Sequence, residues 1–553
     1  MHRITRALSL AMLSLALGTA RPAAGAQSSD EQLAGEVDAL AAMRLQEPGA
    51  VGFSVAVARG GRMLLAKGYG LADLEHDVAA DAETSFRIGS VTKQFTAAAI
   101  MRLLEQGKLS LDDELTRYYP DYPTQGHTVT IRHLLTHTSG IKSYTGVGEF
   151  WETGAARDLS ADELLAYVDD ADFDFTPGQQ FKYSNTGYYM LGAIIEQASG
   201  VPYCEYLQNE FFTRLGLGRT RCDSNADIIP NRAQGYGLED GKLVNDGLIS
   251  MSNAGAAGMI ISTAHDLVTW GMALIGGEVV GAESLEQMIT PIILPSGAST
   301  GYGFGLKRGE TRGHRTIGHG GGVFGFSAML VHVPDEDLHI AVIANVFGEG
   351  TAQLLARDIA AAAFGADESV ADLTPSEEDV ARFSGLYALE GMDREAKIFE
   401  QDGYLFMQPT GQRVTKLLYQ GRGEFRVSHE PSIRIVFDPE SGQDFVLHQG
   451  GGRVKGGRLS LVDLAPSADD VARFGGTYFL ERFNIEAKIF EQDGRLFMQP
   501  AGRPPTRLLY QGEGEFRSSS DASIRIAFEA GHGPDLVLHQ GGRKVKGSRR
   551  SDD

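Results

Sequence analysis

The sequence predicts an α+β fold in which helices flank an antiparallel sheet, followed by two small all-β meander or barrel repeats. Strand-like runs stand at both ends of residues 1–365 and enclose a long helical stretch, which favours one sheet built from both ends. Further on, two segments repeat each other, and each consists of short alternating strands joined by turns. The length of 553 residues also exceeds what one hydrophobic core normally supports, so several domains are expected.

Residues 1–26 are typical of a secretory signal peptide. Arg3 and Arg6 begin the segment, Ala7–Leu17 forms an apolar core, and Ala24-Gly25-Ala26 provides a cleavage site of small residues. The apolar core is too short to be a good membrane span. We therefore expect an exported protein, periplasmic or secreted, without a membrane-spanning segment.

Composition restricts the partners of the chain more than its chemistry. Hydrophobic residues make up 42% and charged residues 22%, as in ordinary folded domains. The formal net charge of −22 argues against nucleic-acid binding, which requires a basic face. Cys204 and Cys222 are the only cysteines, and an oxidising compartment permits either one disulfide or two unpaired thiols.

Hydrophobic patterning in the first domain predicts helices and strands of ordinary length. Gly60-Gly61 joins two strand-like runs as a hairpin, whereas residues 235–258 have a loop-like composition. Residues 318–326 contain too much glycine for a strand centre and suit a place where backbone approaches a ligand. The predicted strands are 51–58, 62–69, 327–333 and 338–346; the predicted helices are 31–46, one ending near 106, 131–136, 161–168, one ending at 200, and 266–274.

The second half of the chain contains an internal repeat without gaps. Residues 379–383 recur at 470–474, and residues 446–450 recur at 537–541, each 91 positions later (470 − 379 = 91; 537 − 446 = 91). The repeats are either a wall that selects ligands or a structural or adhesive module, and we favour the module. The predicted divisions are a signal at 1–26, a catalytic domain at 27–365, a linker at 366–378, and repeats at 379–457 and 458–553.

A pair of residues at the start of one helix suggests covalent catalysis. Ser90 follows a strand-like run and stands where the helix pattern begins, and Lys93 lies three residues later on the same helix face. A lysine whose pKa is lowered by burial can take the proton of a serine nucleophile. The pair alone is weak evidence, because Ser-x-x-Lys also occurs by chance or as a helix cap beside a solvated lysine.

Three other patterns imitate functional motifs. Ser139 and Lys142 repeat the spacing, but Gly140 ends the preceding helix and breaks the shared face. His133 and His137 have the spacing of zinc ligands, yet no glutamate completes a metalloprotease motif, so we interpret them as structural. The histidine and glycines at 319–322 imitate the oxyanion loop of lipases, but the chain has no Gly-x-Ser-x-Gly pentapeptide.

The Ser90-Val91-Thr92-Lys93 motif is followed by Tyr183-Ser184-Asn185 and by His319-Gly320-Gly321. In this order, and with the flanking segments 131–140 and 175–178, the chain from Val51 to Phe364 resembles the serine β-lactamase and DD-peptidase (penicillin-binding protein) superfamily, in its class C-like branch. The resemblance implies a sheet flanked by helices with an all-helical subdomain, and lipocalin-like modules at the C-terminus. The third motif begins with histidine, where true β-lactamases of this branch have lysine.

The resemblance also implies a role for each motif residue. Ser90 forms the acyl-enzyme, Lys93 accepts its proton, and Tyr183 relays a proton to the leaving group. Asn185, His319, Gly320 and Gly321 bind the substrate, with Asn185 also touching Lys93 and His319 tuning the proton network. The backbone N–H groups of Ser90 and Gly322 form the oxyanion hole. No metal and no organic cofactor are expected.

The expected activity is hydrolysis of amide or ester bonds in small peptide-like substrates of D-configuration. The histidine of the third motif favours a D-alanyl-D-alanine carboxypeptidase or a D-aminopeptidase-like enzyme, with cell-wall peptides as possible substrates. A class C-like β-lactamase and a short-chain carboxylesterase are the alternatives within the same chemistry. A penicillin-binding receptor that is acylated without turnover is the alternative of another class.

Overall fold

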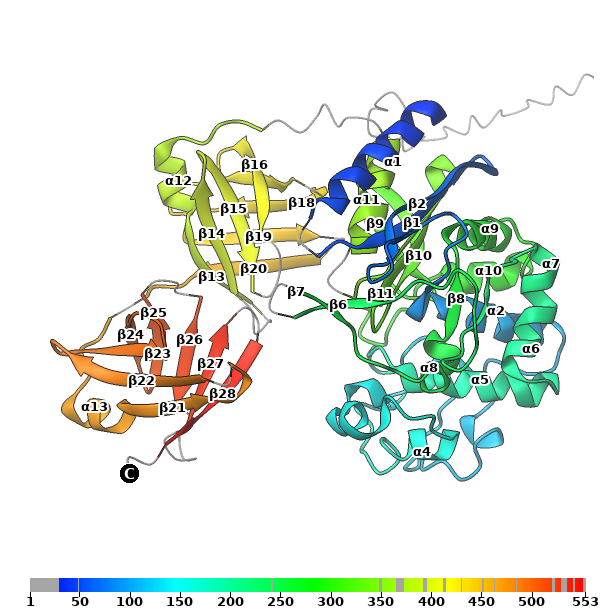
Figure 1. Cartoon of the computed structure of the whole chain (residues 1–553), viewed down its shortest axis with the longest axis horizontal. Helices are drawn as coiled ribbons and strands as arrows, with labels where there is room; N and C mark the ends of the chain where they lie inside the picture. The colour runs from blue at the N-terminus through cyan, green and yellow to red at the C-terminus, as the bar shows by residue number, and fades with distance from the viewer. Residues whose placement is uncertain are drawn as a thin grey trace, which may run out of the picture.

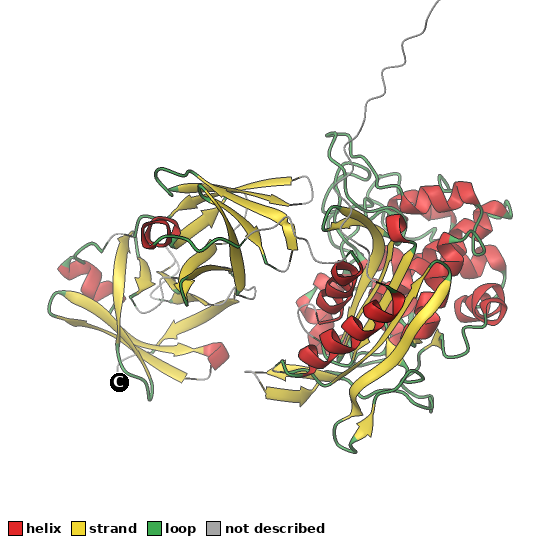
Figure 2. Ribbon diagram, turned by 90° about the horizontal axis from the view of Figure 1, so that it is seen from above, coloured by secondary structure: helices red, strands yellow, loops and turns green. Residues whose placement is uncertain are grey.

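The computed structural model describes residues 29–47, 49–239, 242–347, 351–364, 372–390, 395–410, 414–428, 430–449, 452–461, 463–483, 485–519, 523–528, 535–540 and 543–550. The predicted signal peptide and residues 366–371 of the predicted linker lie outside these ranges. The chain forms a first domain of mixed helices and strands, and two β-barrels that lie to one side of it (Figures 1 and 2). Among the described helices, none is both long and apolar enough to cross a membrane.

A seven-stranded antiparallel sheet in the order β3-β2-β1-β12-β11-β10-β9 forms the centre of the first domain. β1 pairs with β12 through Phe53 and Ala344, so the predicted sheet built from both ends is confirmed. The strands are β1 (Gly52–Arg59), β2 (Arg62–Asp73), β3 (Val78–Ala79), β9 (Lys307–Thr311), β10 (His314–Val323), β11 (Phe326–Val333) and β12 (Leu338–Ala344).

Helices cover both faces of this sheet (Figure 2). α1 (Asp30–Leu45) and α11 (Thr351–Ala363) bury one face through alternating aliphatic residues of β1 and β12. The opposite face packs against the helical part of the domain, whose central helix α2 (Thr92–Glu105) is buried along nearly its whole length. The other helices there are α3 (Ile131–Leu135), α4 (Ala161–Leu165), α5 (Asn185–Ser199), α6 (Tyr203–Leu207), α7 (Thr213–Leu215), α8 (Met251–Gly258), α9 (Ala264–Ile275) and α10 (Ala282–Ile289).

A small sheet joins the start of α2 to the helical part. β4 (Phe86–Arg87) pairs with β8 (Ile260–Ser262), which pairs with β5 (Arg221–Cys222). A disulfide between Cys204 and Cys222, with Cα atoms 5.9 Å apart, ties α6 to β5 and resolves the two alternatives left by the sequence.

Two local predictions were wrong. The glycine-rich run at 318–326 contains the second half of β10, because backbone pairing with β11 replaces the side-chain packing that normally favours a strand. The loop-like segment 235–258 contains β6 (Tyr236–Glu239), β7 (Lys242–Asn245) and α8. Its many small and polar residues carry little hydrophobic periodicity, so composition alone could not show these elements.

Each repeat forms a closed barrel of eight antiparallel strands preceded by a short helix. In both, a tyrosine near the first strand donates a hydrogen bond to the helix: Tyr387 to Phe383 O, and Tyr478 to Phe474 O, each at 2.9 Å. The first unit contains α12 (Glu377–Phe383), β13 (Gly385–Leu389), β14 (Glu395–Gln401), β15 (Tyr404–Pro409), β16 (Thr415–Gly421), β17 (Glu424–Val427), β18 (Glu430–Phe437), β19 (Asp444–Gln449) and β20 (Gly452–Arg458). The second contains α13 (Ala468–Phe474), β21 (Gly476–Leu480), β22 (Ile485–Gln492), β23 (Arg495–Pro500), β24 (Thr506–Gly512), β25 (Glu515–Ser518), β26 (Arg525–Phe528), β27 (Leu536–Gln540) and β28 (Arg543–Arg549).

The two barrels contact each other through an ion pair. Arg517 of the second barrel donates two hydrogen bonds to the carboxylate of Glu395 in the first, at 2.6 and 2.8 Å. The Arg517 side chain is largely buried there, and a two-pronged arginine–carboxylate contact fixes orientation as well as distance.

Candidate active site

Ser90 lies on a tight turn between β4 and α2. Gly89 has a φ of +49°, which glycine adopts at little cost, and a short 3₁₀ turn at Gly89–Val91 leads directly into the helix. The helical spacing then places Lys93 Nζ 3.2 Å from Ser90 Oγ, within hydrogen-bond distance. Ser90 is partly exposed, so a substrate can reach its hydroxyl, whereas Lys93 is fully buried.

The Lys93 ammonium group is fully buried. Nζ donates hydrogen bonds to Asn185 Oδ1 and to Ala257 O, both at 2.8 Å, and these contacts fix its position. Burial holds the pKa of Lys93 well below its usual value, and the positive charge of Lys307 lowers it further. A neutral amine beside Ser90 Oγ is suited to accept the serine proton.

The start of α5 brings the second motif to the same amine. Ser184 caps the helix, and its backbone N–H donates to His137 Nδ1 at 3.1 Å. Asn185 Nδ2 donates to Thr145 Oγ1 at 2.9 Å, and this bond turns the amide oxygen toward Lys93. The helix cap and the side-chain bond together orient Asn185 before any substrate binds.

Tyr183 places its ring next to the lysine. Lys93 Nζ lies 4.8 Å from the ring centre, and among the described residues the buried Tyr183 hydroxyl has no hydrogen-bond partner. Burial raises the pKa of Tyr183, and the neighbouring Ser90 hydroxyl offsets part of that rise. A protonated phenol beside the Ser90 hydroxyl is available to a reacting group.

β10 packs its backbone directly on the Ser90 turn. A side chain at Gly321 would place its Cβ 1.9 Å from Ile88 O, so only glycine fits there. β9 pairs with β10 only as far as Gly318, which leaves the edge formed by the third motif facing the turn. This strand edge is where an oxyanion hole made by Ser90 and Gly322 requires a backbone donor.

The third motif includes a partner that sequence reasoning missed. His319 Nε2 lies 3.0 Å from the Tyr302 hydroxyl, and His319 Nδ1 lies 2.5 Å from Gly320 O, so both ring nitrogens are occupied. Burial lowers the pKa of His319 to about 3, with the charge on Lys93 adding to the effect. The imidazole is therefore neutral, and it supports β10 and Tyr302 without supplying a charge.

The structure thus brings the predicted residues Ser90, Lys93, Tyr183, Asn185, His319, Gly320, Gly321 and Gly322 to one place. Among the residues that imitate other motifs, His137 packs against the Tyr183 ring with ring centres 4.2 Å apart, whereas Ser139, Lys142 and His133 make other contacts. Ser139 Oγ accepts a hydrogen bond from the Ile141 backbone, and Lys142 Nζ lies 3.6 Å from Asp174. His133 Nδ1 caps α3 by accepting the Thr130 N–H.

Lys307 is a second residue that the sequence did not reveal. It begins β9, its Nζ lies 5.9 Å from the Tyr183 ring centre, and its charge acts on Lys93 and His319. Although the residue as a whole is exposed, desolvation of its amine lowers the pKa of Lys307 as well. It is a basic side chain at the rim of the site.

We expect Lys307→Gln to move the acid limb of acylation to higher pH. Removing the positive charge stabilises protonated Lys93, so its pKa rises and less neutral amine is present at low pH. The measurement is the pH profile of kcat/KM with p-nitrophenyl butyrate, which has no carboxylate to bind Lys307. The control is Lys242→Gln on the exposed strand β7; an unchanged acid limb in Lys307→Gln would disprove the coupling.

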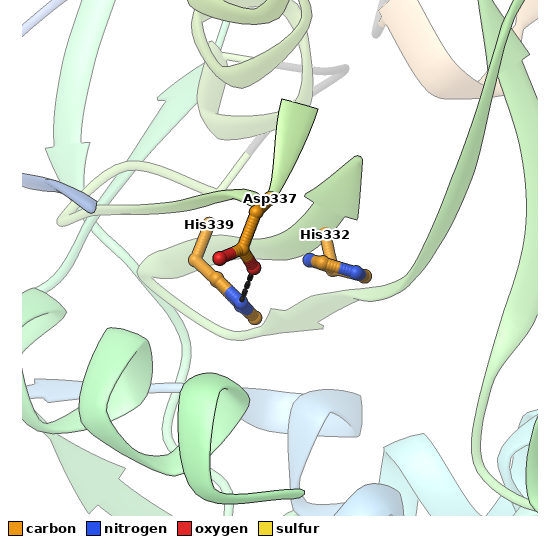
Figure 3. Close-up of side chains that lie close together, drawn as sticks. All are labelled: His332, Asp337 and His339. Atoms are coloured by element: carbon orange, nitrogen blue, oxygen red, sulfur yellow. Dashed lines mark ion pairs between the residues drawn. The ribbon is translucent and has the colours of Figure 1, made fainter. Parts of the chain in front are cut away.

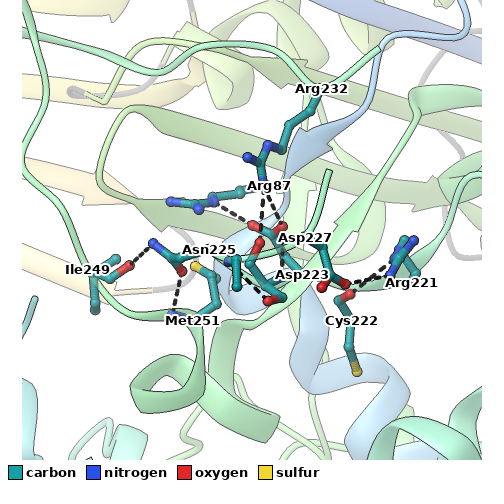
Figure 4. Close-up of polar contacts among 11 residues, drawn as sticks. Arg87, Arg221, Cys222, Asp223, Asn225, Asp227, Arg232, Ile249 and Met251 are labelled. Carbon is teal, nitrogen blue, oxygen red and sulfur yellow. Dashed lines mark hydrogen bonds and ion pairs between the residues drawn. The ribbon is translucent and has the colours of Figure 1, made fainter. Parts of the chain in front are cut away.

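A cluster of ion pairs centred on Asp223 holds β4, the strand that precedes Ser90, in place. The carboxylate of Asp223 is fully buried and accepts hydrogen bonds from Arg87 Nε at 2.6 Å and Arg232 Nη1 at 3.2 Å (Figure 4). Asp223 directly follows Cys222 of the disulfide, while Arg87 stands three residues before Ser90. The cluster therefore connects β5, which carries the disulfide-bonded Cys222, to the turn that carries Ser90.

We expect Asp223→Asn to destabilise the fold by about 3 kcal/mol, because two arginines lose their shared charge in a buried place. The midpoint of urea unfolding measures this change. Asp227→Asn is the matched control, since Asp227 pairs with Arg221 in an exposed position and should shift stability by less than about 1 kcal/mol. Equal losses of stability from the two substitutions would contradict a stabilising role for the buried Asp223 ion pairs.

Three aromatic side chains form a wall beside the third motif: Trp151, Phe324 and Phe347. Neighbouring ring centres are 5.2 and 6.3 Å apart, and Trp151 Nε1 donates to Thr145 O at 2.9 Å. A Cβ at Gly322 would lie 3.2 Å from the Phe347 ring. Trp151 and Phe347 remain 41% and 44% exposed, so this aromatic wall offers apolar surface to a ligand.

Comparison with known proteins agrees with this arrangement. Residues 37–364 match the family described as Beta-lactamase. Penicillin-binding protein 4* of Bacillus subtilis (strain 168) is 25% identical over 425 residues, which cover 72% of this chain and 93% of that protein.

Two solved structures share the fold. The octameric penicillin-binding protein homologue from Pyrococcus abyssi has a TM-score of 0.55 at 24% identity, covering 84% of this chain and 98% of its own. That share extends beyond the first domain into the barrels. The D-amino acid amidase from Ochrobactrum anthropi SV3, in complex with L-phenylalanine amide, has a TM-score of 0.51 at 25% identity, covering 60% and 96%. Because the family match spans more than half of the chain, this protein belongs to the beta-lactamase family.

Proposed function

We propose that this protein is an exported serine hydrolase that cleaves amide or ester bonds through an acyl-enzyme at Ser90. The observation that carries the proposal is the buried Lys93 amine 3.2 Å from Ser90 Oγ, with a pKa held well below its usual value. The disulfide between Cys204 and Cys222 supports export, because such bonds persist in oxidising compartments.

The proposed reaction has two halves. Ser90 Oγ attacks the carbonyl carbon while its proton passes to Lys93, and the carbonyl oxygen gains negative charge against the backbone donors of Ser90 and Gly322. The Tyr183 hydroxyl then gives its proton to the departing amine or alcohol and takes the proton held by Lys93, while the acyl group stays on Ser90. Water, activated by the same network, releases the acid and restores the serine.

We propose D-amino-acid amides and short peptides with an apolar side chain as the preferred substrates. The similarity to a D-amino acid amidase supports the D-configuration. The aromatic wall supports the side-chain preference, since it borders Gly322 on one side and Thr145, the partner of Asn185, on the other. Lys307 supplies a cation for a free carboxylate on the leaving side.

A substrate panel with the mature protein tests this function. It compares D-phenylalanine p-nitroanilide, its L-enantiomer, a D-alanyl-D-alanine peptide, p-nitrophenyl butyrate and a chromogenic cephalosporin. We expect the highest kcat/KM for the D-phenylalanine compound. Preferred turnover of the cephalosporin would identify a β-lactamase, preferred turnover of the butyrate an esterase, and stable acylation without turnover a penicillin-binding receptor; each contradicts the proposed preference.

The aromatic wall predicts a separate effect on binding. We expect Trp151→Ala to raise KM for the D-phenylalanine compound about five- to tenfold, because a stacked aromatic contact contributes roughly 1 kcal/mol beyond simple burial. Trp151→Phe should restore most of the affinity, and D-alanine p-nitroanilide should show little change in either variant. An equal rise in KM for the D-phenylalanine and D-alanine compounds in both variants would contradict a role of Trp151 in side-chain recognition.

A further inference from the structure

Two histidines and an aspartate meet at the end of the central sheet, outside the active site. His332 is the last residue but one of β11 and His339 the second residue of β12; they lie opposite each other in the strand register, and their ring centres are 4.3 Å apart. Asp337 closes the turn between the strands with a φ of +43° and turns its carboxylate toward the rings (Figure 3). Its Oδ1 lies 3.8 Å from His339 Nε2, and one donor atom from each of the three residues lies within 4.8 Å of the others.

Both imidazoles are buried without enough hydrogen bonds. His332 is 7% exposed and His339 is 2% exposed, and among the described residues neither Nδ1 has a hydrogen-bond partner. Buried imidazoles with an unpartnered nitrogen are uncommon in folded proteins, and the other nitrogen of His339, Nε2, is the one that faces Asp337 and is placed to hold an ion. The Asp337 side chain is 60% exposed, so the cluster has a route to solvent.

The surroundings make room for the histidines, and among the described residues they leave both Nδ1 atoms without a hydrogen-bond partner. On the strands at either side, Ala58 pairs with His339 and Ile317 pairs with His332. Below them, a Cβ at Gly271 of α9 would lie 3.2 Å from His339 Nδ1, so that helix leaves space for the ring. Two aliphatic side chains in place of the histidines would fill this core position at lower cost, which argues against simple packing as their purpose.

We propose that His332, Asp337 and His339 bind a zinc ion. Imidazole nitrogen and carboxylate oxygen are zinc ligands, and three protein ligands leave a fourth tetrahedral position for water on the exposed side. Tetrahedral ligand atoms lie about 3.3 Å apart, so zinc binding requires Asp337 and the two stacked rings to rotate until their donor atoms, now within 4.8 Å of one another, face the ion.

The zinc ion would stabilise the end of the central sheet. His332 stands five residues along β11 from Ser327, which pairs with Gly322, so the zinc site lies about 17 Å from Gly322. It is closer to His319, which stands two residues along β10 from Ile317, the partner of His332. It fixes the turn between β11 and β12, and β11 in turn holds β10 by its backbone bonds.

Zinc binding by the full, untagged, chelator-treated protein tests the proposal, with isothermal titration for affinity and visible absorption of the Co²⁺ form for geometry. We expect one Zn²⁺ per chain, a higher Tm with ZnCl₂, and the intense absorption of four-coordinate Co²⁺. Asp337→Asn should weaken zinc binding at least tenfold while leaving the metal-free Tm unchanged, because asparagine tolerates a left-handed backbone.

The control is Asp335→Asn in the same turn. Asp335 lies 3.7 Å from His314 and 3.6 Å from Arg315, and it does not belong to the cluster. Its substitution should leave zinc affinity unchanged. The proposal is overturned if the native protein binds no zinc at micromolar concentration, if Asp337→Asn binds as tightly as the native protein, or if only Asp335→Asn loses affinity.

Discussion

Ser90→Ala is expected to lower kcat/KM for every substrate of the panel by roughly 10⁴- to 10⁶-fold, because no other group can form the acyl-enzyme. Intact-mass measurement after incubation with a fluorescent penicillin or a slow ester should show an adduct on the native protein and none on the variant. The substitution removes one partly exposed hydroxyl, so the thermal unfolding midpoint should stay close to the native value.

Ser139→Ala provides the matched control for Ser90. Ser139 stands three residues before Lys142, just as Ser90 precedes Lys93, but its hydroxyl accepts a hydrogen bond from the Ile141 backbone. We expect full labelling and nearly native turnover from the control variant. An adduct that persists in Ser90→Ala and vanishes in Ser139→Ala would reverse the assignment of the two motifs.

Lys93→Met is expected to reduce the acylation rate at neutral pH by about 10³-fold while the protein stays folded. The loss reflects the removal of the base that accepts the Ser90 proton. Methionine fills a similar volume without an amine that must be buried, so the penalty for lost hydrogen bonds to Asn185 and Ala257 is partly offset. Stopped-flow acylation and urea unfolding separate the two effects.

Alkaline pH distinguishes this explanation from a packing defect. Hydroxide can replace a missing base, so the residual rate of Lys93→Met should rise with pH where the native rate is level. Lys142→Met, which changes the lysine of the second Ser-x-x-Lys, should keep the native pH profile. Normal acylation of Lys93→Met near neutral pH would rule out the lysine as the base.

The sequence predicted the parts of the site that depend on local spacing. Ser90 and Lys93 are fixed by the period of one helix, and Asn185 by its place at a helix start, so short motifs sufficed. Tyr302 and Lys307 reach the site only because β9 and its preceding loop pack beside Tyr183. No local pattern marks such residues, since their contact is made entirely by the tertiary fold.

The fold was predicted best where hydrophobic periodicity is strong. β1, β12 and α9 carry clear runs or repeats of aliphatic residues, and the internal repeat predicted two similar β-rich units. β10 was missed because glycine normally weakens a strand, whereas here the Ser90 turn excludes any side chain at Gly321. The close contact between the backbone of Gly321 and the Ser90 turn therefore outweighs the low preference of glycine for strands.

The pairing of β1 with β12 has a consequence for the order in which the protein folds. Phe53 and Ala344 are partners in the middle of the sheet although 291 positions separate them along the chain (344 − 53 = 291). Closing so long a loop is entropically unfavourable, and contacts of this kind form slowly. Each barrel instead pairs successive strands, so it can form from its own segment within local distances. We therefore expect the barrels to refold first, and the central sheet, together with the Ser90 turn that rests on it, to be completed last.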